Sequence, residues 1–413
     1  MKKIYFLFVI LLLTNLKLVA QNKILFDNTK AETASNADWT IDSDLFNLGI
    51  GSSGSYIGGS QSNPQRYPTP AQSTITATTP ETYWTGGISY WGIDCVKKGY
   101  NVETLPWNGQ ITYGVATNPQ DLSNYKAFVV DEPNILFTAA QKTAILNFVA
   151  NGGGLFMISD HDISDRNGDG YDSPHIWNDL MTTNTVAVNP FGISFDYLNF
   201  SGTYSNILNS PSDPILHGTT GNVTQVKWSG GTTMTLNTTQ NSSVKGVVFK
   251  TGTSGLTNVL CAYGTYGLGK FVAIGDSSPP DDGSGDSGDT LYDGYITDAS
   301  GNHQRLLMNA TNWLMSPNLN TETVEDNNNL NPIIYPNPSV NGELNLQFYL
   351  NNNEPVKLCL YDTLGRNVKQ INENDSNVGI NRIKVNTNEI QSGIYVCKLS
   401  TNSFTKSIYV VIK

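Results

Sequence analysis

Residues 155–180, LFMISDHDISDRNGDGYDSPHIWNDL, concentrate side chains that can bind a metal or transfer a proton. The segment starts as an apolar strand and continues as a polar stretch with six aspartates and two of the chain's four histidines. Carboxylates suit hard cations, imidazoles suit transition metals, and both groups transfer protons. Two interpretations follow: the segment binds a metal that only stabilises a loop, or it is the working site.

The spacing within DRNGDGYDS (residues 165–173) is typical of a calcium-binding turn. Asp165, Asn167 and Asp169 occupy positions 1, 3 and 5, and Gly170 occupies position 6, as in the first half of an EF-hand loop. Position 12 is Ile176, where an EF-hand requires a glutamate. We therefore expect a calcium-type turn whose last ligand comes from elsewhere, with a plain Asx/Gly turn as the alternative.

Four apolar segments end in a carboxylate: Asp27, Asp131, Asp160 and Asp276. In an open parallel sheet the ligand crevice lies outside the carboxyl ends of the strands, so these residues are expected to share one site. Crowded carboxylates need protons or a cation. A second acidic loop, residues 275–294, follows the last of these segments and either contributes further ligands or is simply solvated.

Position along the chain assigns roles to these residues. A metal- or carboxylate-activated water and a histidine that moves the proton would make a hydrolase. The predicted catalytic residues are Asp160, His161, His175 and Asp276. The predicted metal ligands are Asp162, Asp165, Asn167, Asp169, Asp172, Asp281, Asp282 and Asp286, with calcium as the expected ion and zinc or another divalent metal as the alternative. The predicted substrate-binding residues are Asp27, Asp131, Glu132 and Trp177.

Strands and helices alternate over residues 21–317. Residues 23–27, 125–131, 155–159 and 269–276 have the apolar character of buried strands. Between them Thr138 and Gln141 have capping-box spacing, NGGG follows that helix, and Asn302 is expected to cap a last helix. The pattern predicts a flavodoxin-like α/β domain, a mostly parallel sheet with helices on both faces. Residues 184–259 are expected to be an insertion that covers one sheet edge.

The two ends of the chain have different functions. Residues 1–20 have the basic start, short apolar core and small final residue of a signal peptide, and no segment is expected to span a membrane. Residues 318–332 are predicted to be a linker. Residues 333–413 contain short alternating strands typical of a small all-β, Ig-like sandwich, in which Cys359 and Cys397 could pair.

Charge excludes one class of partner. The formal net charge is -11, and charged residues make up 14% of the chain. No basic stripe exists to neutralise phosphates, so nucleic acid is not expected as a partner. The mildly acidic, uncharged-polar composition suits an extracellular protein that meets cations or neutral glycans.

The last domain resembles a known family. YPNPS at residues 335–339, LYDTLGRNV at 360–368, SGIYVCKLS at 392–400 and the terminal KSIYVVIK resemble the C-terminal sorting domain of the type IX secretion system of Bacteroidetes. The resemblance implies that the chain is recognised by that machinery and exported across the outer membrane. It also implies removal of this domain, followed by release or attachment to the cell surface.

The α/β part resembles the class I glutamine-amidotransferase-like superfamily, in particular its trehalose-utilisation-like branch. The residues that carry the resemblance are YKAFVVDEPN and FTAAQKTAILNFVANGGGLFMISD, then DPILHG, and finally GKFVAIGDSS and NHQRLLMNATNWL. The resemblance implies the fold. It does not imply glutaminase activity, because the comparable turn reads MISDHD and has neither the nucleophilic cysteine nor its flanking glycines.

Two functions therefore remain. The first is a secreted or surface-attached metal-dependent hydrolase that acts on glycans. The second is a non-catalytic, calcium-stabilised surface protein that binds glycans or a protein partner.

Overall fold

The computed structural model describes residues 22–35, 37–41, 72–284, 292, 294–316, 332–350, 352–362, 365–373, 376–401 and 405–413. The predicted signal peptide at 1–20, the predicted metal ligand Asp286 and the predicted linker up to residue 331 lie outside these residues. The chain divides into two compact units, Met1–Asn318 and Leu319–Lys413, and each is described by itself.

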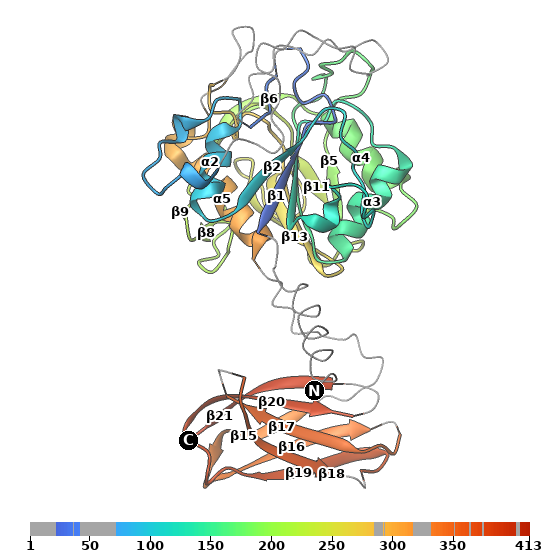
Figure 1. Ribbon diagram of the computed structural model, residues 1–413, viewed down its shortest axis with the longest axis vertical. Coiled ribbons are helices and arrows are strands. Elements are labelled where there is room, and N and C mark those ends of the chain that lie inside the picture. The colour runs from blue at the N-terminus through green and yellow to red at the C-terminus, as the bar shows by residue number, and fades with distance from the viewer. Residues whose placement is uncertain are drawn as a thin grey trace, which may run out of the picture. The chain divides into compact units, whose positions relative to one another are not determined.

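The first unit is built on a sheet whose parallel half has the order β2-β1-β3-β4-β14. Figure 1 shows β1 and β2 of this sheet side by side. These strands are β1 (Lys23–Asp27), β2 (Asn101–Leu105), β3 (Ala127–Asp131), β4 (Gly154–Ile158) and β14 (Gly269–Ile274). This is the doubly wound, flavodoxin-like order. The order in which strands are added to the sheet reverses between β1 and β3, while all five strands stay parallel. The predicted fold class is confirmed.

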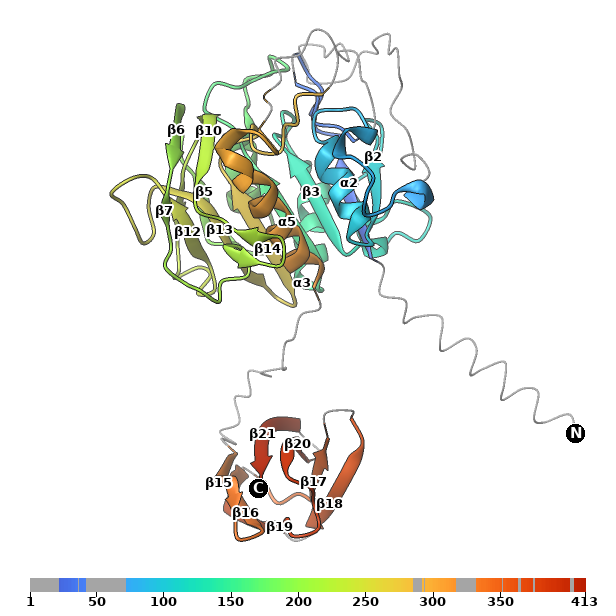
Figure 2. The same ribbon diagram turned by 90° about the vertical axis from the view of Figure 1, so that its left-hand side faces the viewer.

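Helices cover both faces of this sheet, and each face has its own core. Helices α2 (Ser89–Lys97) and α5 (Asn302–Met315) pack on one face, and α3 (Ala139–Ala150) and α4 (Ser173–Thr183) pack on the other. Figure 2 looks onto the face that α2 and α5 cover. Side chains along one strand alternate between these two cores. Val129, for example, faces α2 and α5, whereas Val130 faces α3 and α4.

Local signals set the helix ends. Thr138 and Gln141 form the predicted capping box of α3, and Gly152 adopts a positive φ of 107° just after its end. Asn302 does not cap α5 as predicted. Gly301 is the cap residue, and the Asn302 side chain instead accepts a hydrogen bond from the backbone N–H of Thr224.

Residues 184–259, which were predicted to be an insertion that covers one sheet edge, contribute strands to the sheet itself. Antiparallel strands continue the sheet beyond β14 in the order β13-β11-β5, and β12 and β7 pair on a branch from β13. Two further antiparallel pairs, β6 with β10 and β8 with β9, complete the region. The bounds are β5 (Ile193–Phe195), β6 (Phe200–Tyr204), β7 (Asn206–Ile207), β8 (His217–Gly218), β9 (Gly221–Asn222), β10 (Val226–Gly231), β11 (Met234–Leu236), β12 (Lys245–Phe249) and β13 (Val259–Tyr266).

The second unit is an all-β sandwich, as predicted. One sheet has the order β15-β16-β19, the other has the order β18-β17-β20-β21, and an apolar core lies between them. The strands are β15 (Ile333–Val340), β16 (Glu343–Leu350), β17 (Val356–Tyr361), β18 (Asn367–Glu373), β19 (Gly379–Asn386), β20 (Gly393–Ser400) and β21 (Thr405–Ile412).

Cys359 and Cys397 do not form a disulfide, since both are free thiols. Cys359 lies opposite Lys398 on the neighbouring strand, and Cys397 lies opposite Leu360. This one-residue offset directs the two side chains to opposite faces of the sheet, because strand side chains alternate. Cys397 therefore packs in the core of the sandwich, whereas Cys359 contacts Gln370 on the other face.

Candidate functional site

Three strands direct an aspartate to the same face of the sheet at its carboxyl edge. Asp131 pairs in register with Ile158, which pairs with Ile274. Asp160 lies two residues after Ile158, and Asp276 lies two residues after Ile274. Since Val129, Ile158 and Ile274 all belong to the core beneath α2 and α5, the three carboxyl groups lie on that side. The shared site expected at the strand ends thus forms for these three residues.

The environment of these groups favours their protonated forms. All three are at most 3% exposed. Burial first, and then the charges of Glu132 and Asp276, raise the pKa of Asp160 well above its usual range. Burial, followed by the charges of Glu132, Asp281 and Asp276, does the same for Asp131. Burial also raises the pKa of Asp276 to about 7.

Hydrogen bonding distinguishes Asp276 from Asp131. The Asp276 carboxylate accepts backbone N–H bonds from Ser229 at 2.6 Å and from Ser278 at 2.7 Å. Neither carboxyl oxygen of Asp131 has a hydrogen-bond partner among the described residues. A buried carboxyl group without partners is costly and uncommon in native proteins, so Asp131 marks a position that a proton, an ion or a ligand must satisfy.

Glu132 organises the cluster from a strained backbone. It is fully buried and has a φ of 44°, a left-handed conformation that a residue with a side chain rarely adopts. Its carboxylate accepts hydrogen bonds from Trp39 Nε1 at 2.7 Å and from Ser277 Oγ at 2.8 Å. Arg166 binds it with Nε at 2.5 Å and Nη2 at 3.1 Å. Both oxygens of the predicted substrate-binding residue Glu132 are thus occupied by other parts of the chain.

Arg166 reaches this cluster from the turn at residues 165–170. Its Nη2 also lies 3.6 Å from Asp160 Oδ2, so one guanidinium faces two carboxylates. Asn134 fixes the turn, because its Oδ1 accepts from Arg166 N–H at 3.0 Å and its carbonyl accepts from Asn167 Nδ2 at 2.5 Å. The sequence reasoning missed Arg166, although a single basic residue within so acidic a stretch was a signal.

The side chains of the predicted calcium turn bind its own backbone. Asp165 accepts N–H bonds from Gly168, Asp169 and Gly170, the last at 2.7 Å. Asn167 Oδ1 accepts from Asp169 N–H at 3.2 Å. These contacts form the Asx turns of the alternative interpretation, and calcium binding here stays a prediction.

Metal-ligand geometry occurs nearby, at Asp162, Asp172 and His175. One ligand atom from each lies within 4.8 Å of the other two, the only such group of three or more histidine, cysteine or acidic side chains in the described part of the chain. Asp172 also caps α4, and its Oδ1 contacts His175 Nδ1 at 2.5 Å. The His175 ring stacks on Tyr197 with centroids 4.2 Å apart.

His161 lies between this group and the buried carboxylates. Its Nδ1 lies 2.6 Å from the carbonyl oxygen of Asp162, which can only accept, and 3.0 Å from Nδ2 of Asn199, which can only donate. Its Nε2 lies 3.7 Å from Asp160 Oδ2. His161 and His175 thus have different partners, and only His175 belongs to the metal-ligand group.

Other predicted site residues have structural roles. Trp177 is fully buried between α4 and the sheet and donates to Ile158 O at 3.0 Å, so it cannot stack on a sugar. Asp282 accepts from Tyr90 N–H at 2.8 Å and so caps α2 from a distant loop. Asp281 accepts from the N–H groups of Gly283 and Tyr292 and holds the same loop. Asp27 points to the opposite face of the sheet, toward α3.

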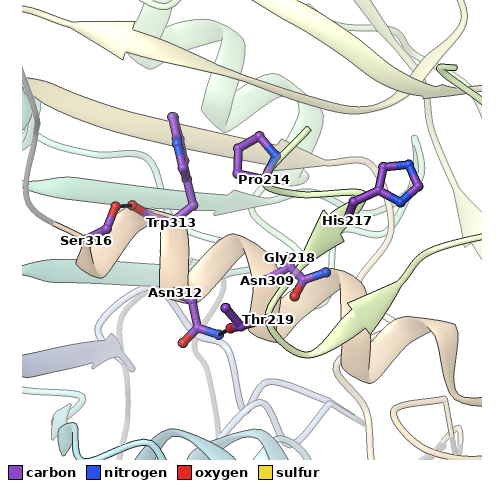
Figure 3. A pocket seen from close by; sticks show the side chains of 8 residues that line it. All are labelled: Pro214, His217, Gly218, Thr219, Asn309, Asn312, Trp313 and Ser316. Carbon is purple, nitrogen blue, oxygen red and sulfur yellow. Dashed lines mark hydrogen bonds between the residues drawn. The ribbon is translucent and has the colours of Figure 1, made fainter. Parts of the chain in front are cut away.

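A pocket of about 420 Å³ lies away from these carboxylates (Figure 3). It lies against the last turns of α5, where Asn309, Asn312, Trp313 and Ser316 line it together with Pro214 and residues 217–219. Leu314 in the same turns packs against Gly154, the first residue of β4. The pocket therefore belongs to the amino edge of the sheet, opposite the carboxylate cluster.

Comparisons with known proteins give two kinds of result. Residues 333–413 match the family described as "Secretion system C-terminal sorting domain". No curated protein matches the chain. Among solved structures, the N-terminal domain of mmIFT52 aligns with a TM-score of 0.41 and 14% identity, over 72% of this chain and 99% of that chain.

Two other solved structures align less closely. A β-galactosidase from Bacillus circulans sp. alkalophilus has a TM-score of 0.30 at 12% identity, over 68% of this chain and 34% of its own. A ThuA-like protein from Parabacteroides merdae has a TM-score of 0.32 at 12% identity, over 52% of this chain and 79% of its own. Such scores assign the α/β domain to none of these families.

The second unit identifies the route by which the protein is exported. Its sandwich coincides with the residues that match the sorting-domain family. In the described part of the chain, no helix is long and apolar enough to cross a membrane. Residues 333–413 therefore form a C-terminal sorting domain of the type IX secretion system, and the chain is exported to the cell surface or secreted.

Proposed function

We propose that the α/β domain is a metal-dependent hydrolase that works outside the cell. One observation supports the proposal above the others: a metal-ligand group and a buried carboxylate cluster lie two residues apart along the chain. Asp162 belongs to the group with Asp172 and His175, and Asp160 belongs to the cluster with Asp131 and Asp276. A divalent ion at the group would polarise a bond and lower the pKa of a bound water.

The residues between the two groups provide the proton transfer. The imidazole of His161 has its Nε2 beside Asp160, so it can exchange a proton there and share the resulting charge with that carboxyl group. Arg166, which is itself held by Glu132, faces Asp160 across 3.6 Å. Asp276 is fixed by two backbone N–H groups and can carry a proton near neutral pH.

Neutral glycans are the substrate class that the chain favours. The protein is exported, its formal net charge is -11, and its composition is rich in uncharged polar residues. The negative net charge of the chain would repel an anionic polymer, whereas sugar hydroxyls can donate to unpartnered carboxyl oxygens such as those of Asp131.

Activity screening of the secreted protein tests this proposal. Aryl glycosides, neutral polysaccharides and, for comparison, aryl esters and phosphate esters are incubated with the protein before and after EDTA treatment. Hydrolysis of a glycoside that EDTA abolishes and a divalent ion restores is the expected result. Asp160→Asn and His161→Ala should each abolish turnover, whereas Asp213→Asn, in an ion pair with Lys245 remote from the cluster, should leave it intact. Turnover that survives in both site variants contradicts the proposal.

A calcium-stabilised binding protein is the second candidate function. It is favoured by the turn at 165–170, where Gly170 has a φ of 93° and donates to Asp165. If calcium raises the melting temperature, Asp165→Asn abolishes that effect, and no substrate is hydrolysed, this second function replaces the first.

A further inference from the structure

The last residue of β1 and the segment that follows it contain several buried oxygen atoms without partners. Asp27 Oδ2, Thr29 Oγ1, Glu32 Oε1 and Thr33 Oγ1 have no hydrogen-bond partner among the described residues. Thr29 is 8% exposed, and the other three residues are 3% exposed or less. Native folds leave few such atoms unsatisfied, and those that remain call for a bound water or ion.

Two of these oxygens belong to adjoining carboxyl groups. Asp27 Oδ1 accepts from Thr29 N–H at 3.2 Å, and Glu32 Oε2 accepts from Lys30 N–H at 2.7 Å. These bonds leave Asp27 Oδ2 and Glu32 Oε1 without donors. Burial raises the pKa of Asp27 to about 6, and the Glu32 carboxyl lies within hydrogen-bonding reach of it. Burial, and then the charge of Asp27, raise the pKa of Glu32 well above its usual range.

The nearby lysine does not neutralise the pair. Lys30 Nζ donates to Gln141 Oε1 at 2.7 Å and lies 5.1 Å from the centroid of the Phe137 ring. It therefore adds one positive charge beside two negative ones while bonding to a neutral amide. Ionised Asp27 and Glu32 leave one negative charge in a buried region, which is costly unless a further positive charge is present.

We propose that Asp27 and Glu32 bind one small monovalent cation, such as sodium, between Oδ2 and Oε1. The charge of the group determines the class of ion. Ionised Asp27 and Glu32 together with charged Lys30 carry one net negative charge, so a monovalent cation makes the group neutral. A divalent ion would leave an uncompensated positive charge. The hydroxyl of Thr29, beside the Asp27 carboxyl, supplies a third hard oxygen ligand. This ion site is separate from the divalent group at Asp162, Asp172 and His175, since neither Asp27 nor Glu32 belongs to that group.

Thermal unfolding of the secreted protein in EDTA tests the site, and an alkaline pH is used because it favours the ionised carboxyls. Sodium chloride and potassium chloride are compared with N-methyl-D-glucamine chloride at equal ionic strength, because that organic cation is too large to enter. We expect a saturable rise in melting temperature of about 4 °C at a hundredfold excess over the Kd of the small ion.

Matched variants identify the residues. Glu32→Gln retains an oxygen for the Lys30 N–H but removes one charge, so the difference between small and large cations should vanish. Asp27→Asn should have the same effect and is used if Glu32→Gln does not fold. Glu103→Gln is the control, because Glu103 is a buried glutamate paired with Lys23 at 2.7 Å, and its loss should leave the ion dependence unchanged.

Three results would overturn the assignment. Equal melting temperatures in all three chlorides would mean that the pair shares a proton and binds no ion. An ion effect that persists in both Glu32→Gln and Asp27→Asn would place the ion elsewhere. Stabilisation by calcium alone, lost in Glu32→Gln, would refute the monovalent charge. None of these results depends on hydrolase activity.

Discussion

Replacing Asp131 by asparagine should stabilise the α/β domain at neutral and alkaline pH. The two side chains have nearly the same shape, but the amide has no charge and carries two donors. The Asp131 carboxylate has no hydrogen-bond partner among the described residues and is repelled by Glu132, Asp276 and Asp281. Removing an unsatisfied buried group recovers about 1–3 kcal/mol, and the new amide can donate to the surrounding carboxylates.

The gain should depend on pH in one direction. Because the pKa of Asp131 is raised in the folded protein, its protonated form is favoured by folding. Its contribution to stability is present below the unfolded pKa and is lost as pH rises through the folded pKa. The variant should therefore match the wild type near about pH 4 and exceed it increasingly toward about pH 8.

Thermal unfolding of both proteins across this pH range measures the effect. For a domain of about 300 residues, the expected gain corresponds to a rise of about 2–5 °C in melting temperature at about pH 8. Asp121→Asn is a control of opposite sign. Burial raises the pKa of Asp121, but hydrogen bonds from Ser123 and Thr112 lower it to about 2. Replacing Asp121 should therefore cost about 1–3 kcal/mol of stability.

A loss of stability in Asp131→Asn at alkaline pH would refute the reasoning. Such a loss would mean that the carboxylate has a favourable partner, such as a bound cation. A pH-independent gain would also contradict it, because it would show that the charge of Asp131 does not contribute.

Three further predictions concern other parts of the chain. Arg166→Met should destabilise the domain by about 3–5 kcal/mol, measured by urea unfolding, because it leaves Glu132 buried and unpaired, and Glu132→Gln in the same chain should restore part of the loss. His175→Ala should remove one bound divalent ion per chain, measured by elemental analysis after dialysis, whereas His217→Ala should remove none. Mass spectrometry of secreted protein should show a start near residue 21 and the loss of a fragment from about residue 333, and an intact C-terminus on surface-located protein would count against this processing.

The local signals in the sequence were sufficient for the α/β core and the sandwich. Apolar runs such as that of β3 are buried on both faces, and the Thr138 capping box starts α3 where expected. These features depend on neighbouring residues, so a single sequence records them. The alternating strands of residues 333–413 likewise predicted the sandwich, and the motifs there resembled the sorting domain, which the family match confirms.

The strand ends show where sequence reasoning stops. The run of carboxylates after apolar segments predicted a common site, and Asp131, Asp160 and Asp276 do meet. Asp27 ends an equivalent strand but faces α3, because its position in the alternation differs. A one-residue change in register reverses the face of a side chain, and a strand prediction with uncertain ends cannot determine it.

The contacts that give each group its chemistry were decided only by tertiary structure. Glu132 is bound by Trp39, Arg166 and Ser277, which lie far apart in the sequence. Asp282 seemed free to bind a metal, yet it caps α2, a helix that starts nearly two hundred residues earlier. Residue type and spacing thus determined which groups could bind ions or protons. Burial and long-range partners decided which of them are satisfied and which await a ligand.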